Sequence, residues 1–492
     1  MTRVVVIGAG LSGLSAACHL AGGGAEVTLV EASGGPGGRA GSLELGGYRF
    51  DTGPTVITMP DLVERCFTVL GKDMGDYLHM RPVDPMYRAC FADGSELRVR
   101  HGVDAMAEEI RRECGPEDAA GFVRFARRLT ELYRLEMPNF IERNYDSVLD
   151  LLRPLRPALE LVRLGAFGRL DPWVRRYFRD ERLVRLFSFQ SLYAGLAPYE
   201  ALALYAVITY MDAVNGVVVP DGGVHALPTA IARAAADSGV ALRYDAPVER
   251  IVLDRADGGP VRGVRLVGGE LLACDAVVCT ADLAVAYRTM LPGLDPPRAL
   301  RRAHRSPSAL VWHVGVRGPL PTAAAHHNIH FGIRWNDSFK ALLDDGRRMP
   351  DASLLVTAPT VDEPSMAPPG RHVLYVLEPV PNLDAPIEWS TERKRARDDL
   401  FHALTRFGYS RDIEVEHLVD PEDWAAEGLD RGTPFALSHR FFQSGPFRPA
   451  NHDRRAPGLY FAGASTVPGV GVPMVLVSGM LAAERVLGGT SR

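Results

Sequence analysis

The stretch that decides the fold is Arg3-Val4-Val5-Val6-Ile7-Gly8-Ala9-Gly10-Leu11-Ser12-Gly13, near the start of a chain of 492 residues. Residues 3–8 form an apolar run of strand length, and 11–22 follow with helical periodicity. Residues 26–31, Glu-Val-Thr-Leu-Val-Glu, have the composition of a second short strand. The chain therefore opens with a βαβ unit, from which parallel sheets covered by helices are built.

The glycines of this stretch follow the spacing G-x-G-x-x-G between the first strand and the helix. Gly8 permits the tight turn, Gly10 lets the backbone approach a pyrophosphate, and Gly13 lets the helix pack closely on the strand. The phosphates would then lie at the helix N-terminus, where free N–H groups and the helix dipole favour negative charge. Glu31 ends the second strand, 18 residues beyond Gly13, where an acid hydrogen-bonds ribose hydroxyls. These features predict a dinucleotide site, although the spacing does not choose between NAD and FAD.

Beyond this unit, helical and α/β patterns alternate along the chain. Residues 50–220 carry amphipathic helical patterns, for example over 103–113 and 118–136. The α/β pattern returns over 221–280 and near the C-terminus, whereas 300–440 indicates strands and loops. In the two later α/β blocks we expect a helix ending near 237, strands at 240–243, 248–253, 275–279 and 458–462, a hairpin of 261–267 with 270–273, and a terminal helix over 473–487.

This alternation predicts an α/β fold with a discontinuous, Rossmann-like dinucleotide-binding domain and an interposed α+β domain. The expected dinucleotide-binding domain comprises 1–80, 216–300 and 440–492. The expected substrate domain, which also meets the membrane, comprises 81–215 and 301–439. A pocket between two such domains is the usual place for a ligand.

Composition and charge exclude several classes of protein. With 47% hydrophobic residues the chain can bury large cores, and its net charge of −5 gives no positive field for nucleic acid. No apolar run reaches the length of a membrane span, so we expect a cytoplasmic protein, soluble or peripheral to a membrane. Six cysteines in so long a chain suggest no secreted disulfide framework. Cys274 and Cys279 flank a predicted strand that turns them to opposite faces, which argues against a redox pair.

Further motifs resemble one protein family. Gly37-Gly38-Arg39-Ala40-Gly41-Ser42 resembles the G-G-R-x-x-S extension of the flavin amine oxidase and carotenoid desaturase superfamily, and the stretch over 47–55 resembles its F-D-x-G-P-T segment beside the flavin. Residues 459–473, Leu-Tyr-Phe-Ala-Gly-Ala-Ser-Thr-Val-Pro-Gly-Val-Gly-Val-Pro, resemble the carotenoid-desaturase signature. The chain thus resembles the bacterial and fungal phytoene desaturases nearly from end to end. Other segments that match family patterns in the same order are 187–195, 219–223, 275–279 and 326–332.

This resemblance implies one FAD per chain and a reaction in which flavin N5 takes hydride from a long polyene such as phytoene. No nucleophile or acid–base constellation is visible, so no catalytic side chain and no metal ligand is assigned. Reduced flavin is expected to pass electrons to oxygen or a quinone, because the chain has only one dinucleotide fingerprint. A terminal helix from Pro473 would stabilise negative charge on the flavin. The residues expected to bind FAD are Gly8, Gly10, Leu11, Ser12, Gly13, Glu31, Gly38, Arg39, Thr52, Gly53, Pro54, Val248, Gly463, Ala464, Gly471, Val472 and Pro473.

One position departs from the family pattern. Many bacterial members have T-H-P-G where this chain has Thr466-Val467-Pro468-Gly469, which weakens any mechanism that uses an imidazole there. The exact substrate and the number of desaturation steps therefore stay open. Alternative functions are a carotenoid saturase, oxygenase or isomerase, a flavin amine oxidase, and a non-catalytic FAD-binding membrane scaffold.

Three clustered histidines, His326, His327 and His330, have a spacing that can converge on a metal in a helix. Ile329 and Phe331 alternate with polar neighbours, which favours a strand. No carboxylate or cysteine lies nearby in the sequence to complete a metal site. We expect these histidines to pack in the core or to line the substrate cleft.

Residues 151–190 contain nine arginines and four acidic residues, a net charge of +5, interleaved with apolar residues that include Trp173 and Tyr177. Two interpretations are open for this stretch. It is either a membrane-surface patch, with arginines on anionic headgroups and apolar side chains in the interface, or a solvated helix face. A lipophilic substrate favours the first.

Overall fold

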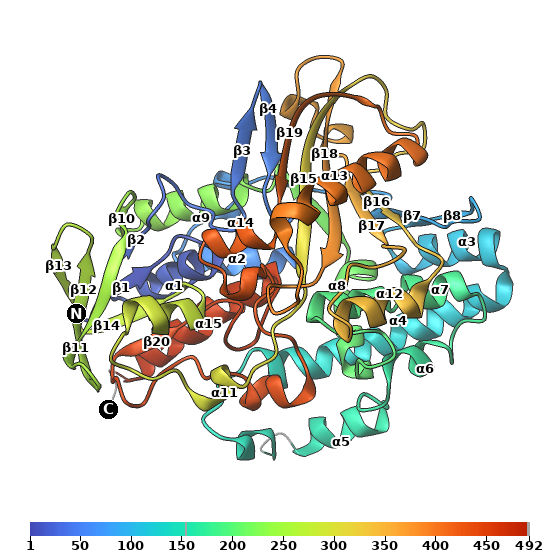
Figure 1. Cartoon of the computed structure of the whole chain (residues 1–492). Helices are drawn as coiled ribbons and strands as arrows, with labels where there is room; N and C mark the ends of the chain where they lie inside the picture. The colour runs from blue at the N-terminus through green and yellow to red at the C-terminus, as the bar shows by residue number, and fades with distance from the viewer. Residues whose placement is uncertain (153–154, 490–492) are drawn as a thin grey trace.

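The structure is a computed structural model that describes residues 1–152 and 155–489. Two large sheets and a helical region make up the molecule (Figure 1). The parallel sheet lies at the left of Figure 1, the antiparallel sheet at the top centre and right, and most of the helical region at the lower right.

The first sheet is wholly parallel, with its five strands in the order β10-β2-β1-β14-β20. These strands come from three segments far apart in the sequence, so the predicted discontinuous Rossmann-like fold is confirmed. For these five strands, each predicted strand agrees with the observed one to within one residue at either end. The strands are β1 (Arg3–Ile7), β2 (Glu26–Val30), β10 (Ala241–Arg243), β14 (Ala276–Cys279) and β20 (Leu459–Phe461).

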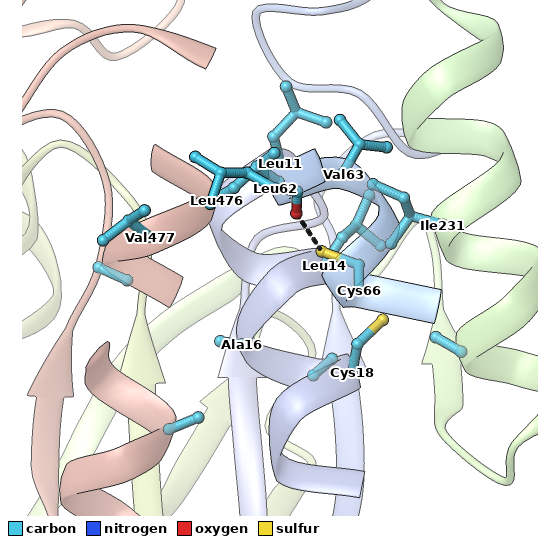
Figure 2. Close-up of a cluster of buried hydrophobic side chains, with 14 of the residues drawn as sticks. Leu11, Leu14, Ala16, Cys18, Leu62, Val63, Cys66, Ile231, Leu476 and Val477 are labelled. Carbon is cyan, nitrogen blue, oxygen red and sulfur yellow. Dashed lines mark hydrogen bonds between the residues drawn. The ribbon is translucent and has the colours of Figure 1, made fainter. Parts of the chain in front are cut away.

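Alternating side chains give this sheet two buried faces. Val4 and Val6 pack toward helices, whereas Val5 and Ile7 pack into a separate apolar cluster on the other side. Figure 2 shows leucine, valine, isoleucine and cysteine side chains from four helices meeting in the first cluster. This packing fixes the glycine-rich turn at the end of β1. The four helices are α1 (Leu11–Gly22), α2 (Pro60–Thr68), α9 (Ala226–Asp237) and α15 (Val472–Gly489).

A small antiparallel sheet, β11-β12-β13, packs on the other face and contains the predicted hairpin. Cys274 and Cys279 are buried in the same cluster there, as free thiols. The prediction that they point to opposite faces of one strand is wrong, because β14 begins only at Ala276 and Cys274 precedes it. The strands of this sheet are β11 (Val248–Arg255), β12 (Gly258–Leu266) and β13 (Leu271–Ala273).

The second large sheet has seven strands in the order β19-β15-β18-β17-β16-β7-β8, all antiparallel except for the parallel pair β16 and β7. The prediction of strands and loops alone over 300–440 is wrong for α12 (Trp335–Leu343), α13 (Trp389–Arg406) and α14 (Pro421–Ala426). Helix α13 packs on this sheet through a thin apolar stripe. The strands are β7 (Tyr87–Cys90), β8 (Glu96–Val99), β15 (Ser308–Arg317), β16 (His327–His330), β17 (Leu354–Thr357), β18 (Arg371–Val380) and β19 (Asp412–Val419).

The helical region packs against the β7–β16 end of that sheet around a further apolar core. A three-stranded sheet, β5-β9-β6, connects this region to the segment that follows the glycine-rich motifs. The helices predicted over 103–113 and 118–136 are confirmed. The elements are β5 (Ile57–Thr58), β6 (Met80–Pro82), β9 (Val217–Pro220), α3 (Val103–Cys114), α4 (Pro116–Glu136), α5 (Leu155–Arg163), α6 (Leu170–Val174), α7 (Glu181–Leu186) and α8 (Ala206–Ala213).

Candidate cofactor and substrate site

Two glycines of the turn between β1 and α1, Gly8 and Gly13, leave no room for a side chain. Gly8 has a φ of 101°, a conformation that favours glycine. A Cβ atom on Gly13 would lie 1.9 Å from the carbonyl oxygen of Gly8, so a larger residue would push α1 away from β1. The N-cap residue, Gly10, provides no side-chain cap for the first turn of α1. Uncapped amides at a helix N-terminus are suited to bind a pyrophosphate.

Glycines from two other segments converge on the start of α1. Gly37 forms a β-bridge with Gly10, and a Cβ atom on Gly38 would lie 3.2 Å from the Gly10 Cα. From the C-terminal segment, a Cβ atom on Gly463 would lie 3.5 Å from the Ser12 hydroxyl oxygen. Main chain therefore surrounds this helix terminus from three sides. We call this arrangement of Gly10, Ser12, Gly37, Gly38 and Gly463 the glycine cradle, and its shape fits the diphosphate of a dinucleotide.

Glu31 lies directly after β2, at the edge of the glycine cradle. One of its carboxylate oxygens accepts a hydrogen bond from the Ala9 amide at 2.7 Å, and the other accepts one from the Ser33 amide at 2.9 Å. The Ala246 amide donates to the Glu31 carbonyl at 2.8 Å, which brings Val248, at the start of β11, to the same edge. Glu31, which is expected at the ribose, and Val248, which is expected to bind FAD, thus lie near each other.

Arg39 and the segment 52–54 pack against each other next to the cradle. A Cβ atom on Gly53 would lie 2.0 Å from the Arg39 carbonyl oxygen, so Thr52 and Pro54 flank a close main-chain contact. The Arg39 side chain is partly buried, and burial lowers its pKa while Asp282 opposes the shift. A positive charge is therefore held inside the protein, where an anionic ligand would stabilise it.

The C-terminal turn connects the cradle to α15. The Gly463 amide donates to the Ser478 hydroxyl at 3.0 Å, and that hydroxyl donates to the Val467 carbonyl at 2.7 Å. The Ala464 carbonyl accepts a hydrogen bond from the buried Arg448 guanidinium at 2.6 Å. The conformation of the turn is thus fixed by buried polar partners on both sides.

Helix α15 begins at Val472, one residue before the predicted start at Pro473 and directly after Gly471, whose φ is 115°. It crosses α1 closely, since a Cβ atom on Gly479 would lie 2.3 Å from the Ser12 carbonyl oxygen. The N-terminus of α15 lies two turns beyond this crossing, about 10 Å along the helix. A contact between this terminus and a flavin ring stays a prediction.

An imidazole lies at the C-terminal turn even though Val467 stands where many family members have histidine. A Cβ atom on Gly469 would lie 2.0 Å from His439 Nε2. His439 is 9% exposed, and burial lowers its pKa well below the ordinary value, so the ring is neutral. Sequence reasoning missed this residue because nothing in its own segment indicates a contact with the turn.

Two of the three clustered histidines flank Thr55, next to the predicted flavin segment. His326 places Nδ1 2.8 Å from the Asp362 carboxylate and Nε2 3.2 Å from the Thr55 carbonyl. The Nε2 of His327 lies 2.5 Å from the Thr55 hydroxyl. His330 stacks instead on a phenylalanine ring, with centroids 3.7 Å apart. The strand prediction is confirmed, and no group of metal-ligating side chains is found in residues 1–152 and 155–489.

Known proteins are similar in sequence to this chain along nearly its whole length. Residues 11–487 match the family described as flavin containing amine oxidoreductase. Phytoene dehydrogenase of Streptomyces griseus is 50% identical, over 99% of this chain and 95% of its own. The chain belongs to the phytoene desaturase family. The zeta-carotene-forming phytoene desaturase of Myxococcus xanthus is 38% identical, over 99% of this chain and 94% of its own.

The fold of the desaturase also occurs in amine oxidases. Cyclohexylamine oxidase from Brevibacterium oxydans aligns over 100% of both chains with a TM-score of 0.60 and 20% sequence identity. At that identity the likeness concerns the fold alone. As a family member, the desaturase is an FAD-dependent oxidoreductase. FAD, when bound, supplies a hydride acceptor, and the chain supplies binding, orientation and the exclusion of water.

Proposed function

We propose that the desaturase oxidises phytoene, or a closely related long polyene, and extends its conjugated double bonds in carotenoid biosynthesis. The observation that carries this proposal is the 50% identity, along nearly the whole chain, with the phytoene dehydrogenase of Streptomyces griseus. Such a hydrocarbon has no charge and no hydrogen-bonding group. It must therefore be held by apolar surface.

The interposed domain has a cluster of aromatic rings around the C-terminal ends of β7 and β16. Phe331 stacks on Phe91, with ring centroids 5.2 Å apart, and meets Phe189 edge-on at 5.7 Å. Phe189 in turn meets Tyr193 edge-on at 5.8 Å. We call these four rings the aromatic wall. This cluster of aromatic rings in the interposed domain supports the binding of a long hydrocarbon.

For the cofactor, the proposed placement follows the geometry around α1. Gly8, Gly10, Leu11, Ser12 and Gly13 would hold the diphosphate, and Glu31 with Val248 the nucleoside. The segments 52–54 and 471–473 would lie beside the ring system. This placement supports an FAD-binding domain of 1–80, 216–300 and 440–492, because all five strands of the parallel sheet lie in those ranges. The substrate domain is then 81–215 and 301–439.

The desaturase is further proposed to be cytoplasmic and to bind the membrane surface through exposed apolar side chains. Leu155, Leu159 and Val162 are 59–68% exposed and repeat at i, i+4 and i+7, so they share one face of α5. Helix α5 projects from the lower edge of the molecule in Figure 1. No described helix is long and apolar enough to cross a membrane. The apolar patch consists of Val148, Leu149, Leu155, Leu159, Val162, Phe167, Phe441 and Phe442.

The arginines of 151–190 contribute less to this surface than the sequence predicts. Trp173 is 2% exposed, so the expectation that it enters the interface is wrong. Arg153 lies outside the described residues, and Arg156 and Arg163 are exposed on α5 beside the apolar patch. Electrostatic attraction should therefore be a modest part of membrane binding. The arginines that pair with acidic neighbours are Arg175, Arg179 and Arg182.

Co-sedimentation with anionic liposomes tests the apolar patch. Replacing Leu155, Leu159 and Val162 together by serine should weaken binding by about tenfold or more, because apolar contact with the interface is lost. Serine at Val267 and Leu271, which are 63% and 48% exposed on the small sheet, is the matched control and should change nothing. Unaltered binding of the triple variant would move the docking surface elsewhere.

Oxygen or a quinone is the proposed electron acceptor, because the sequence carries only one dinucleotide fingerprint. The function itself is tested by pigment analysis of a host that makes phytoene and expresses this chain. We expect carotenes with longer conjugated systems. Unchanged phytoene beside FAD-loaded protein would instead favour a downstream carotenoid substrate, a saturase or an amine oxidase.

A further inference from the structure

The aromatic wall has one polar corner, formed by Tyr87, Gln190 and Asp212. Asp212 lies near the end of α8, and Gln190 follows Phe189 of the wall. The Gln190 amide nitrogen donates to the Asp212 carboxylate at 3.3 Å and lies 3.5 Å from the Tyr87 hydroxyl. Gln190 is 1% exposed and Tyr87 is 2% exposed, so these polar groups lie within an apolar core.

Gln190 is itself held in one orientation. Its amide nitrogen also donates to the Leu186 carbonyl at 3.1 Å, and its amide oxygen accepts from the Thr209 hydroxyl at 3.3 Å. Thr209 is 1% exposed. The nitrogen of the amide therefore faces Asp212, and the carboxylate is positioned by a buried network rather than by a solvent contact.

The polar corner lies close to the predicted flavin segment. Strands β16 and β7 are parallel, and Asn328 lies opposite Arg88. His327 and Tyr87, one residue earlier on each strand, are therefore level and point to the same face of the sheet. His327 contacts the Thr55 hydroxyl, directly after the segment 52–54. A substrate that reaches the flavin from the interposed domain would pass this corner.

Asp212 has no positively charged partner among the described residues, and only neutral donors act on it. Burial raises its pKa to about 6, although the side chain is not fully buried. Tyr193 is 45% exposed, and burial likewise raises its pKa. Both side chains thus keep some accessible surface that a substrate can reach. An uncompensated carboxylate in such a place destabilises the fold and calls for a functional reason.

We propose that Asp212 is the catalytic residue that accepts the proton lost by the polyene, an inference that rests on the proposed function. FAD, when bound, would supply the acceptor for one hydrogen of the substrate together with the electron pair of its C–H bond. The C–H bond on the adjacent carbon gives its proton to an Asp212 carboxylate oxygen, and its electron pair becomes the new double bond. The negative charge of Asp212 also stabilises positive charge that develops on the hydrocarbon.

The pH dependence follows from the groups that face Asp212. These are Tyr87 of β7 and Tyr193, which both stay neutral because their pKa values are raised. Helix α4 also packs on α8. Its Glu136 contributes to the raised pKa of Tyr205 and not to that of Asp212. Asp212 must be ionised to accept a proton, so the desaturation rate should fall as the pH is lowered through about 6.

The decisive variant is Asp212→Asn, which keeps the shape of the side chain. The desaturation rate of this variant should be lower by about 100-fold or more and should no longer fall as the pH is lowered through about 6. Its FAD content and phytoene binding should be unchanged. Asp212→Glu should recover part of the rate. Asp337→Asn, on the exposed surface of α12, is the matched control and should behave as wild type. A wild-type rate for Asp212→Asn, or a loss of FAD or phytoene binding equal to the loss of rate, would overturn the proposal.

Two further readouts do not depend on turnover. Infrared titration of wild type should show a protonated carboxyl band that disappears as the pH rises through about 6 and is absent from Asp212→Asn. Because the folded pKa is raised, ionised Asp212 destabilises the fold at pH 8 and not at pH 4, so Asp212→Asn should melt higher only at pH 8. If Asp212→Asn fails to fold, Tyr87→Phe should move the pH limb of the rate upward, and an unmoved limb would contradict the proposal. If the wild type shows the carboxyl band but does not oxidise phytoene, both the proposed function and the proton-acceptor role of Asp212 fail. If the enzyme is active but the band is missing, only the role of Asp212 is overturned.

Discussion

The glycine cradle and the aromatic wall are built from different parts of the chain for their expected ligands. The cradle is made of main chain: Gly10, Gly37 and Gly463 meet at an uncapped helix terminus, and a Cβ atom on Gly37 would lie 2.8 Å from the Ala40 carbonyl oxygen. The wall is made of side chains, with the rings of Phe91, Phe189 and Phe331 in mutual contact. A site built from main chain tolerates no added atom, whereas an apolar wall tolerates exchanges of similar volume. Substitutions should therefore act steeply in the first region and gradually in the second.

The largest effect is expected for Gly13→Ala. Its Cβ atom would lie 1.9 Å from the Gly8 carbonyl oxygen, so α1 would have to move away from β1. We expect a loss of about 3 kcal/mol or more in the free energy of unfolding, together with loss of bound FAD. Chemical denaturation and the flavin absorbance of the purified protein measure both. Gly35→Ala is the control, since a Cβ atom there has no neighbour within 4 Å, and an equal effect of the two variants would refute the packing argument.

A smaller effect is expected for Glu31→Ala. The carboxylate fixes the Ala9 and Ser33 amides at the edge of the cradle, and its removal leaves them without that partner. We expect FAD affinity to fall by about 1–3 kcal/mol, with the fold retained. Titration of the apoprotein with FAD measures this change. Unchanged affinity would show that the nucleoside end is held elsewhere.

The smallest effect is expected for Phe331→Leu in the aromatic wall. The exchange keeps an apolar side chain at a position that is 4% exposed, so stability should change by less than about 1.5 kcal/mol. FAD content should stay at the wild-type level, and KM for phytoene should rise by no more than about tenfold. A loss of FAD from this variant would contradict the separation of the two regions.

The same contrast explains how much the sequence could predict. The first and last strands of the parallel sheet are apolar runs that lead into glycine-rich turns. Such runs indicate both where a strand lies in the sequence and that a ligand-binding turn follows it. Helix α13 was missed because its buried face is thin: Ala396, Leu400 and Leu404 alternate with many charged residues. The break before Ala276 was missed because Asp275, which precedes β14, was included in the predicted strand 275–279.

Site residues that belong to a sequence motif could be predicted, whereas site residues that only the fold brings together could not. Gly8, Gly13 and Glu31 carry a local spacing that names their role, and the structure brings them to one edge. Asp212 and His439 carry no such spacing. Their surroundings come from segments more than 20 residues away, such as Gln190 for Asp212 and Gly469 for His439, and burial of a single acid or histidine is not visible in a sequence.

The most direct test of the account is anaerobic mixing of the FAD-loaded desaturase with phytoene in liposomes, followed by absorbance. We expect flavin absorbance to be bleached while a new band of a longer conjugated polyene appears, and the reaction to stop there until oxygen or a quinone is added. Oxidised flavin and unchanged phytoene, in a sample where FAD is bound and the protein sediments with the liposomes, would contradict it.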